Sequence, residues 1–272
     1  MSVDNQQIEI DLLLQAIFVK YGYDFRDYAK ASIKRRILKR LSLSGLGSVS
    51  EMQHRLLNDA VFFRQLLLDL SINVTEMYRD PSFYLTFRER VIPHLKTLPH
   101  IKLWHAGCST GEEVYSLAIM FQEENLDDKT QVYATDINEN VLKKAKAGIY
   151  PEDKIKGSEQ NYQKSKGVKQ LSDYYLKKYG YVTMKNGLKK NILFADHNLA
   201  TDESFGEMTV ILCRNVLIYF NQKLQNRVIG IFNESLAQGG YLCLGTKETI
   251  RFTCYGNQFK EIDREAKIYQ KI

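Results

Sequence analysis

The chain has 272 residues, 44% of them hydrophobic and 26% charged, and a formal net charge of +6 at pH 7. This length allows one large domain or a small domain with a medium one, and the composition is ordinary for a globular protein. The polar N-terminus lacks an export pattern, and no apolar run approaches the roughly 18 residues that a membrane span needs. We therefore expect a cytoplasmic protein that inserts no segment into a membrane.

Residues 1–72 are predicted to form a small helical domain that packs on the remainder of the chain. Apolar residues recur at helical spacing in the stretches 8–18, 29–41 and 62–70, and Gly22 and Gly45 are placed to end the first two helices. Residues 73–100 are predicted to form a linker to the next domain.

From residue 101 to 272 the pattern alternates between strands and helices, which predicts βαβ crossovers and a mostly parallel sheet. The predicted strands span 101–104, 131–135, 191–195, 209–213 and 240–245. The predicted helices span 114–123, 139–147 and 222–237. Two further strands, 252–259 and 266–271, are expected to form a terminal antiparallel hairpin.

An insertion, residues 151–193, is expected before the third parallel strand. In it the strand-like run Tyr181–Met184 is followed by Lys185-Asn186-Gly187 and a second apolar run. Because Asn-Gly is the preferred two-residue turn of a β-hairpin, the sequence predicts a hairpin that turns at Asn186-Gly187.

The cysteines and histidines show no spacing typical of a disulfide framework or a metal site. The four cysteines include no Cys-x-x-Cys pair, and the five histidines are scattered. Buried thiols in a reducing compartment, and no metal, are therefore expected. The positive charge suits an acidic protein surface as well as nucleic acid, so charge alone does not identify a partner.

The most informative stretch joins the first predicted strand to the first helix. Its sequence is Ala106-Gly107-Cys108-Ser109-Thr110-Gly111-Glu112-Glu113. A strand, a glycine turn and a helix bring backbone N–H groups close to a ligand in doubly wound α/β folds. Two carboxylates at the end of this turn would repel a pyrophosphate and favour a cationic ligand. S-adenosylmethionine, with its ammonium and sulfonium groups, fits this chemistry.

Three acidic residues near the turn are candidates for ligand contacts. Adjacent acids on one helix point in different directions, so we assign Glu113 to the cofactor ammonium and Glu112 to the helix N-terminus. The alternative is that neither acid contacts a ligand, because the helix dipole by itself favours acidic residues in the first turn. Asp136 closes the second strand, where α/β folds place an acid on the ribose hydroxyls. The alternative for Asp136 is a cap of the next helix.

Further candidates come after the third and fourth predicted strands. Ligands in an open α/β sheet lie beyond the carboxyl ends of its strands. By this rule the site includes Asn198 and Leu199 after the third strand, and Arg214, Asn215 and Tyr219 after the fourth. The alternative for Tyr219 is a core aromatic residue.

Five ordered motifs together resemble the CheR family of chemotaxis receptor methyltransferases, over about residues 10–272. They are Asn73-x-Thr75-x-x-x-Arg79, Ala106 to Glu113, Ala134-Thr135-Asp136-Ile137, His197-Asn198-Leu199 and Cys213-Arg214-Asn215-Val216-x-Ile218-Tyr219-Phe220. Taken alone, the first motif is typical of an interdomain linker. The resemblance implies a Rossmann-like class I methyltransferase fold, with a small inserted β-hairpin subdomain, behind an all-α domain.

The resemblance also implies a cofactor site and a substrate. The residues that it places around S-adenosylmethionine are Asn73, Thr75, Arg79, Gly107, Glu113, Asp136, Asn198, Leu199, Arg214 and Asn215. Arg79 and Tyr219 would lie nearest the transferred methyl group. The family methylates glutamate side chains on chemoreceptor coiled coils, which yields glutamyl methyl esters and S-adenosylhomocysteine. We therefore expect a chemoreceptor cytoplasmic domain as partner, no nucleic acid, and a monomeric enzyme.

The family's N-terminal helices are implicated in receptor contact. The residues that this suggests are Lys34, Arg35, Arg36, Lys39 and Arg40. The alternative is that this basic run is simply the solvent-exposed face of a helix and contacts no partner. Two positions depart from the family pattern, Met77 for Phe and Val114 for Pro, and neither removes a proposed functional group. Relatives that dock on a receptor's C-terminal pentapeptide carry a glycine-bearing loop that residues 179–193 lack, so we expect no such tethering.

Methyl transfer to a glutamate needs no general base, because a carboxyl with a pKa of about 4.3 is already ionised near neutrality. Tyr219 would orient the carboxylate through one neutral hydrogen bond. A tight pair with the target would quench its nucleophilicity, so Arg79 is assigned mainly to cofactor placement. Two alternatives stay open: a nucleic-acid methyltransferase, although the chain lacks the Pro-Pro turn of adenine methylation, and a non-catalytic cofactor-binding signalling module.

Overall fold

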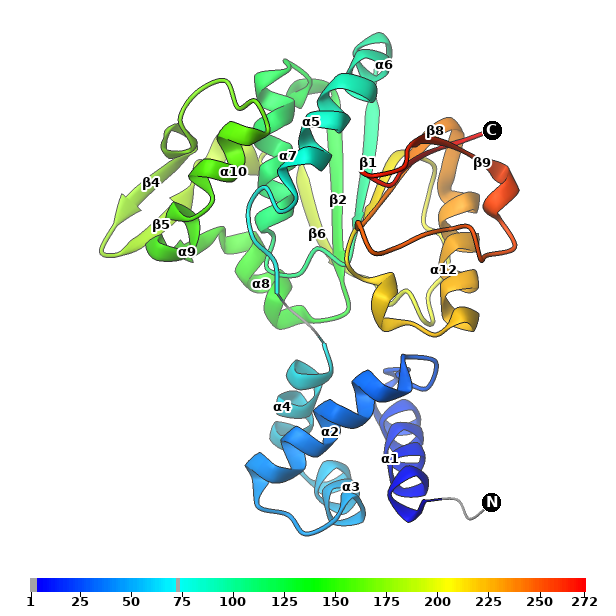
Figure 1. Ribbon diagram of the computed structural model, residues 1–272. Coiled ribbons are helices and arrows are strands. Elements are labelled where there is room, and N and C mark those ends of the chain that lie inside the picture. Colours follow the sequence, from blue (N-terminus) through cyan, green and yellow to red (C-terminus); the bar gives the residue numbers. More distant parts are fainter. Residues whose placement is uncertain (1–3, 72–73) are drawn as a thin grey trace.

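The computed structural model describes residues 4–71 and 74–272. Figure 1 shows a helical N-terminal part beside a larger α/β part. The helices of the first part are α1 (Asn5–Tyr21), α2 (Lys30–Ser44), α3 (Val49–Asn58) and α4 (Ala60–Leu70). Gly22 and Gly45 end α1 and α2 in the left-handed conformation, with φ of 78° and 65°, as predicted. The apolar stripes of these helices meet in one core, which confirms the all-α fold.

A seven-stranded sheet forms the centre of the α/β part, in the order β6-β2-β1-β7-β8-β10-β9. Its strands are β1 (Ile101–Ala106), β2 (Thr130–Asp136), β6 (Ile192–Asp196), β7 (Met208–Cys213), β8 (Leu236–Leu244), β9 (Phe259–Asp263) and β10 (Ile268–Lys271). The first five strands in this order pair in parallel, whereas β10 is antiparallel to β8 and β9. The predicted mostly parallel sheet is confirmed. The strand order reverses between β1 and β7, where such sheets bind their ligands.

Helices cover both faces of this sheet (Figure 1). Those of the α/β core are α5 (Pro81–Arg90), α6 (Ile92–Thr97), α7 (Glu112–Glu123), α8 (Glu139–Ala147) and α12 (Gln222–Ser235). Successive residues of β1 face opposite layers: Leu103 is buried with α5 to α8, and Trp104 is buried with α12. No helix within residues 4–71 or 74–272 has both the length and the apolar character needed to cross a bilayer.

The insertion forms a second, antiparallel sheet, in which the predicted turn is corrected. Its elements are β3 (Ile149–Pro151), α9 (Glu152–Lys156), α10 (Glu159–Lys164), β4 (Tyr175–Lys178), β5 (Tyr181–Met184) and α11 (Asn186–Lys189). The prediction of a turn at Asn186-Gly187 is wrong, because Asn186 begins α11 and the hairpin turns at Tyr179-Gly180. Both turn residues have positive φ, 52° and 74°, which suits a two-residue hairpin turn. Leu188 is buried in the main core, and its burial favours the helical turn.

The first strand of the terminal hairpin also begins later than predicted. Strand β9 starts at Phe259, and the segment before it lies against α12. Gln222 donates to the carbonyl of Phe252 at 2.6 Å, and the N–H of Cys254 donates to Asn226 at 2.9 Å. Side chains of α12 thus satisfy backbone groups that a longer strand would have paired.

Candidate functional site

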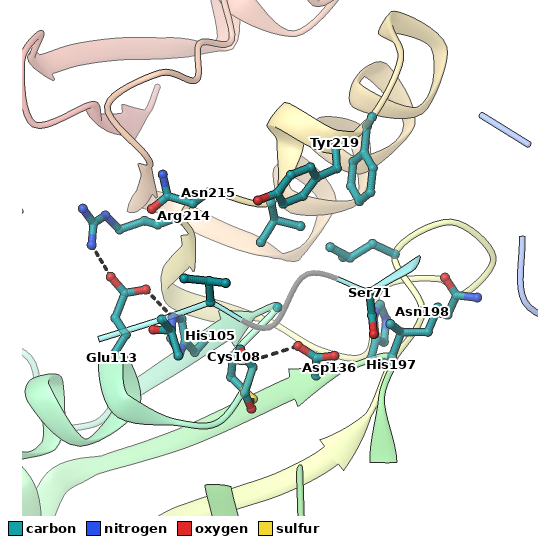
Figure 2. Close-up of a pocket in the computed structure, with 18 of the residues that line it drawn as sticks. Ser71, His105, Cys108, Glu113, Asp136, His197, Asn198, Arg214, Asn215 and Tyr219 are labelled. Atoms are coloured by element: carbon teal, nitrogen blue, oxygen red, sulfur yellow. Dashed lines mark hydrogen bonds and ion pairs between the residues drawn. The ribbon is translucent and has the colours of Figure 1, made fainter. Parts of the chain in front are cut away.

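A cleft of about 920 Å³ lies at the carboxyl ends of β1, β2, β6 and β7. Loops of the α/β part line most of it, and Tyr28, Leu70 and Ser71 of the N-terminal part complete it. Figure 2 shows side chains from β1, α7, β2 and the loops after β6 and β7 around this cleft.

The glycine turn after β1 lies close to the loop after β7. Gly107 has φ of 77°, and a Cβ atom there would come within 2.6 Å of the Val216 side chain. The turn folds back on β2, because the N–H of Ser109 donates to Asp136 at 2.8 Å. Only glycine therefore allows the two loops to approach and to leave the cleft open between them.

Asp136 lies in the wall of the cleft, and the cap of α8 is its neighbour Asn138, whose side chain accepts the N–H of Asn140 at 3.0 Å. The Asp136 carboxylate accepts the N–H of Asn138 at 3.0 Å, at the start of α8. Burial raises the pKa of Asp136, and the N–H groups of Asn138 and Ser109 oppose this rise. An ionised carboxylate has about four acceptor sites, so it can still receive two ribose hydroxyls.

Glu113 lies in the wall of the cleft within a buried ionic cluster. One oxygen pairs with Arg214, and the other lies 2.8 Å from Nε2 of His105 (Figure 2). Arg214 also pairs with Asp80 at 2.8 Å and lies over the ring of Phe83. Burial by itself raises the pKa of Glu113, but Arg214 and His105 outweigh it and hold this pKa at about 2. The carboxylate is therefore ionised at any physiological pH.

Glu112, the neighbour of Glu113, points elsewhere. It is fully buried, pairs with Lys154 of α9 and accepts a hydrogen bond from Thr110 at 2.6 Å. It joins α7 to the insertion and does not line the cleft. The two acids therefore differ in environment, and of the two Glu113 is the one that lines the cleft.

The loop after β7 is held by a residue that sequence reasoning missed. Glu248 is 4% exposed, and its carboxylate accepts the N–H groups of Asn215 at 2.9 Å, Ile218 at 3.2 Å and Gly245 at 2.6 Å. These bonds hold Asn215 at a φ of 61°, uncommon for a residue other than glycine. The spacing Gly245-x-x-Glu248 directly after β8 is a signal that could have identified this acid.

Arg79 and Tyr219 lie at the side of the cleft that adjoins the N-terminal part. Tyr219 is half-buried; burial raises the pKa of its hydroxyl, and the nearby charges of Arg36 and Arg79 oppose the rise. Within the described part of the chain, the Arg79 guanidinium makes one long hydrogen bond, 3.4 Å, to the carbonyl of Val74. Arg79 thus retains donors for a ligand.

The five basic residues of α2 do not share one environment. Arg35 and Lys39 are exposed, and Lys34 pairs with Asp4 at 3.3 Å. Arg40 pairs with Asp69, and Arg36 is buried against the carbonyl of Leu70 and the ring of Tyr219. Of the five candidates for receptor contact, Arg36 is therefore buried against Tyr219 and does not lie on the exposed face of α2.

The structure brings the sequence candidates together around one cleft. Those that line it are Thr75, Arg79, Gly107, Glu113, Asp136, Asn198, Leu199, Arg214, Asn215 and Tyr219. Asn73 lies outside the described residues. Tyr28, Ser71 and His105 are among the lining residues that sequence reasoning missed.

The chemistry of the lining groups fits S-adenosylmethionine. Asp136 suits the ribose diol, Glu113 suits the ammonium, and the apolar residues Ile137, Leu199 and Val216 can cover the flat faces of adenine. His105 is 1% exposed, and its Nδ1 atom has no hydrogen-bond partner among the described residues.

Comparison with known proteins agrees with this assignment. Residues 73–268 match the family described as "CheR methyltransferase, SAM binding domain", and residues 8–71 match "CheR methyltransferase, all-alpha domain". The "Putative methyltransferase Cher3" of Pseudomonas putida is 49% identical over 98% of both chains. The "Chemotaxis protein methyltransferase" of Borreliella burgdorferi is 31% identical, over 92% of this chain and 91% of that protein. One of the same name from Listeria monocytogenes is 31% identical, over 84% and 85%. The chain therefore belongs to the CheR family of S-adenosylmethionine-dependent methyltransferases.

Proposed function

We propose that this protein methylates glutamate side chains on the cytoplasmic helices of a chemoreceptor, with glutamyl methyl esters as products. The observation that carries the proposal is the pairing of a cofactor cleft with two hydrogen-bond donors, Arg79 and Tyr219, in a chain whose relatives are named chemotaxis protein methyltransferases. The acceptor is a carboxylate, and both donors suit an anion.

Bound S-adenosylmethionine supplies an electrophilic methyl group on a sulfonium sulfur. A glutamate oxygen forms the new C–O bond while the electron pair of the broken S–C bond returns to sulfur. No proton leaves the acceptor, so no general base is required. The raised pKa of Tyr219 keeps its hydroxyl protonated as a neutral donor to the incoming carboxylate. Because positive and negative charges cancel as the bond forms, the largely buried cleft favours the reaction.

Arg79 is assigned chiefly to placing the cofactor. A bidentate pair between Arg79 and the target glutamate would make the glutamate oxygens weaker nucleophiles. A pair between Arg79 and the carboxylate of the methionyl group would leave the nucleophile unaffected. Calorimetry on Arg79→Ala tests this division of roles. Weakened binding of S-adenosylmethionine supports cofactor placement, and unchanged binding with lost turnover would assign Arg79 to the acceptor.

The exposed part of α2 is the proposed receptor contact. Arg35 and Lys39 are exposed, whereas Arg36 lies against the ring of Tyr219, which lines the cleft. An acidic receptor helix that crosses α2 would therefore bring its glutamates towards Tyr219. Attraction between exposed charges is weakened by salt, so association with the receptor should weaken as ionic strength rises.

Methyl transfer from S-adenosylmethionine with a radiolabelled methyl group tests the proposed function. The acceptors are chemoreceptor cytoplasmic fragments, RNA and a cell lysate. Label on the receptor that base releases as methanol confirms a glutamyl ester. Label only on RNA would establish a nucleic-acid methyltransferase instead. Cofactor binding without transfer to any acceptor would indicate a non-catalytic module.

A further inference from the structure

Three described residues of the N-terminal helical part line the cleft. Tyr28 lies in the loop between α1 and α2, whereas Leu70 and Ser71 lie at the end of α4. The other lining residues that the structure describes fall between Val74 and Phe220. A cofactor bound in the cleft would therefore be bordered by both parts of the molecule.

Ring contacts and the backbone hold Tyr28 against the loop after β7. Its ring meets that of Phe220 edge-on, with centroids 4.9 Å apart, and that of Phe25 in the same way at 5.0 Å. An antiparallel bridge also pairs Tyr28 with Phe220. The N–H of the next residue, Ala29, donates to the carbonyl of Tyr219 at 2.8 Å. These contacts fix the phenol at the edge of the cleft, so little side-chain freedom is lost when a ligand packs against it.

The hydroxyl of Tyr28 lies within electrostatic reach of Asp136, the carboxylate that suits the ribose. Burial raises the pKa of Tyr28, and the charge of Asp136 adds to the rise, whereas Arg36 opposes it. The phenol is therefore neutral at physiological pH. A neutral aromatic ring near Asp136 suits the nucleoside half of the cofactor better than its charged amino-acid half.

Hydrogen bonds join the two parts at the rim of the cleft. The side chain of Asn138, in the loop after β2, donates to Ser71 at 3.0 Å. The N–H of Asn221, at the end of the loop after β7, donates to the carbonyl of Asp27 at 2.9 Å. Both loops also carry residues that line the cleft. The helical part thus docks on loops that border the cofactor.

Away from this rim, two further hollows lie between the parts. One is lined by Tyr21 and Tyr23 with the start of α8, and the other by Asp24 and Arg26 with α12. The joint is therefore incompletely packed, and parts joined in this way move relative to each other unless something adds to their contact. A ligand that touches both parts adds such contact.

We propose that Tyr28 is a cofactor-binding residue, whose ring packs against the nucleoside half of S-adenosylmethionine, so that bound cofactor holds the helical part on the α/β part. The inference goes beyond the proposed function and does not depend on the receptor substrate. Whatever binds only the docked arrangement stabilises it, so cofactor binding and docking reinforce each other. The ring contact is removed by Tyr28→Ala and kept by Tyr28→Phe.

Calorimetry with the full chain tests the ring contact. The two ligands are S-adenosylhomocysteine and methylthioadenosine, which keeps the nucleoside and lacks the amino-acid end. For Tyr28→Ala we expect both ligands to bind about tenfold more weakly, because the variant loses the aromatic surface. For Tyr28→Phe we expect affinities within about threefold of wild type, because the ring remains.

Asp27→Ala is the matched control in the same loop. The Asp27 side chain accepts a hydrogen bond from Asn221 at 3.1 Å and pairs with Lys223 at 2.7 Å across the joint, but it does not line the cleft. Because such surface pairs are weak, both affinities should stay within about threefold of wild type. Equal losses in Asp27→Ala and Tyr28→Ala would mean that Tyr28 acts through docking alone, which contradicts contact with the cofactor.

Hydrogen exchange tests the coupling between cofactor and docking. The N–H of Ala29 donates across the joint, and in wild type it should exchange about fivefold more slowly when S-adenosylhomocysteine is saturating. In Tyr28→Ala, saturation with the same ligand should give less protection. Exchange at Ala29 that the ligand leaves unchanged in wild type would contradict the coupling.

Further outcomes would overturn the proposal. Full affinity of Tyr28→Ala for both ligands would exclude the ring contact. Weaker binding of S-adenosylhomocysteine alone would place Tyr28 at the amino-acid half. If Tyr28→Ala does not fold, nuclear Overhauser contacts between labelled tyrosine rings and bound methylthioadenosine are compared in wild type and Tyr28→Phe. A contact that Tyr28→Phe lacks supports the proposal, and identical contacts in both proteins contradict it. Normal binding without receptor methylation would refute only the proposed substrate.

Discussion

The guanidinium of Arg36 lies over the ring of Tyr219, 5.2 Å from its centroid, and so connects the N-terminal part to the wall of the cleft. The backbone joins the two parts at the same point: the N–H of Ala29 donates to the carbonyl of Tyr219 at 2.8 Å, and that of Asn221 to the carbonyl of Asp27 at 2.9 Å. The helical part therefore helps to position Tyr219, in addition to any contact with a receptor.

Arg36→Ala is expected to lower kcat for methyl transfer by about tenfold, because a partly desolvated cation–π contact contributes about 1–2 kcal/mol and Tyr219 would lose its support. Arg35→Ala is the matched control on the same helix, with an exposed side chain. It should raise the KM for the receptor and leave kcat unchanged. Steady-state kinetics with a receptor fragment measures both parameters. Equal effects of the two substitutions on KM alone would contradict a positioning role for Arg36.

Glu248→Gln is expected to destabilise the α/β part by about 2–3 kcal/mol and to weaken binding of S-adenosylmethionine, because an amide N–H group would face a backbone N–H group in a buried site. Urea unfolding followed by the fluorescence of Trp104, the sole tryptophan, reports on this part of the chain. Glu234→Gln, on the exposed side of α12, is the control and should change neither property. Unaltered stability and cofactor binding in Glu248→Gln would show that the loop after β7 holds its shape without this carboxylate.

The sequence predicted the sheet and most of the cleft because those features depend on local patterns. Strand ends, a glycine turn and the acid after β2 can be read from neighbouring residues, and the topology then brings Gly107, Asp136 and Asn215 together. The role of Glu248 depends instead on contacts with a distant segment. The spacing Gly245-x-x-Glu248 marks an acid just after a strand end, but it does not indicate that the loop 30 residues earlier is the segment whose N–H groups this acid accepts.

The misplaced hairpin has a similar physical origin. Asn186-Gly187 has a strong local preference for a hairpin turn, yet the burial of Leu188 in the main core favours a helical turn there. Tyr179-Gly180 forms the turn although tyrosine seldom adopts a positive φ. Packing and pairing of β4 with β5 therefore outweigh local preference in this insertion.

Gly107→Ala is expected to abolish most cofactor binding, because its Cβ would lie 2.6 Å from the Val216 side chain and the residue has φ of 77°. Val216→Ala alone should have a small effect on cofactor binding, since it removes only the methyl groups that a Cβ at position 107 would meet. The double variant should recover part of the lost affinity, with the remaining loss due to backbone strain of about 1 kcal/mol. Calorimetry with S-adenosylhomocysteine on all four proteins measures the coupling. Purely additive losses would contradict a steric conflict between the two loops.

Glu113→Gln is expected to lower the free energy of unfolding at pH 7 by about 3 kcal/mol, because it leaves the buried Arg214 with one carboxylate in place of two. The folded-state pKa of Glu113, about 2, lies below the unfolded value of about 4.3. Its ionisation therefore stabilises the fold fully above about pH 4.3, and this contribution is lost as pH falls towards 2. The difference between wild type and Glu113→Gln should be constant from pH 7 to 5 and shrink at pH 3. Urea unfolding at these three values measures it, with the exposed Glu139→Gln as control. If the difference in unfolding free energy is as large at pH 3 as at pH 7, the packing of the Glu113 side chain, and not its charge, stabilises the fold.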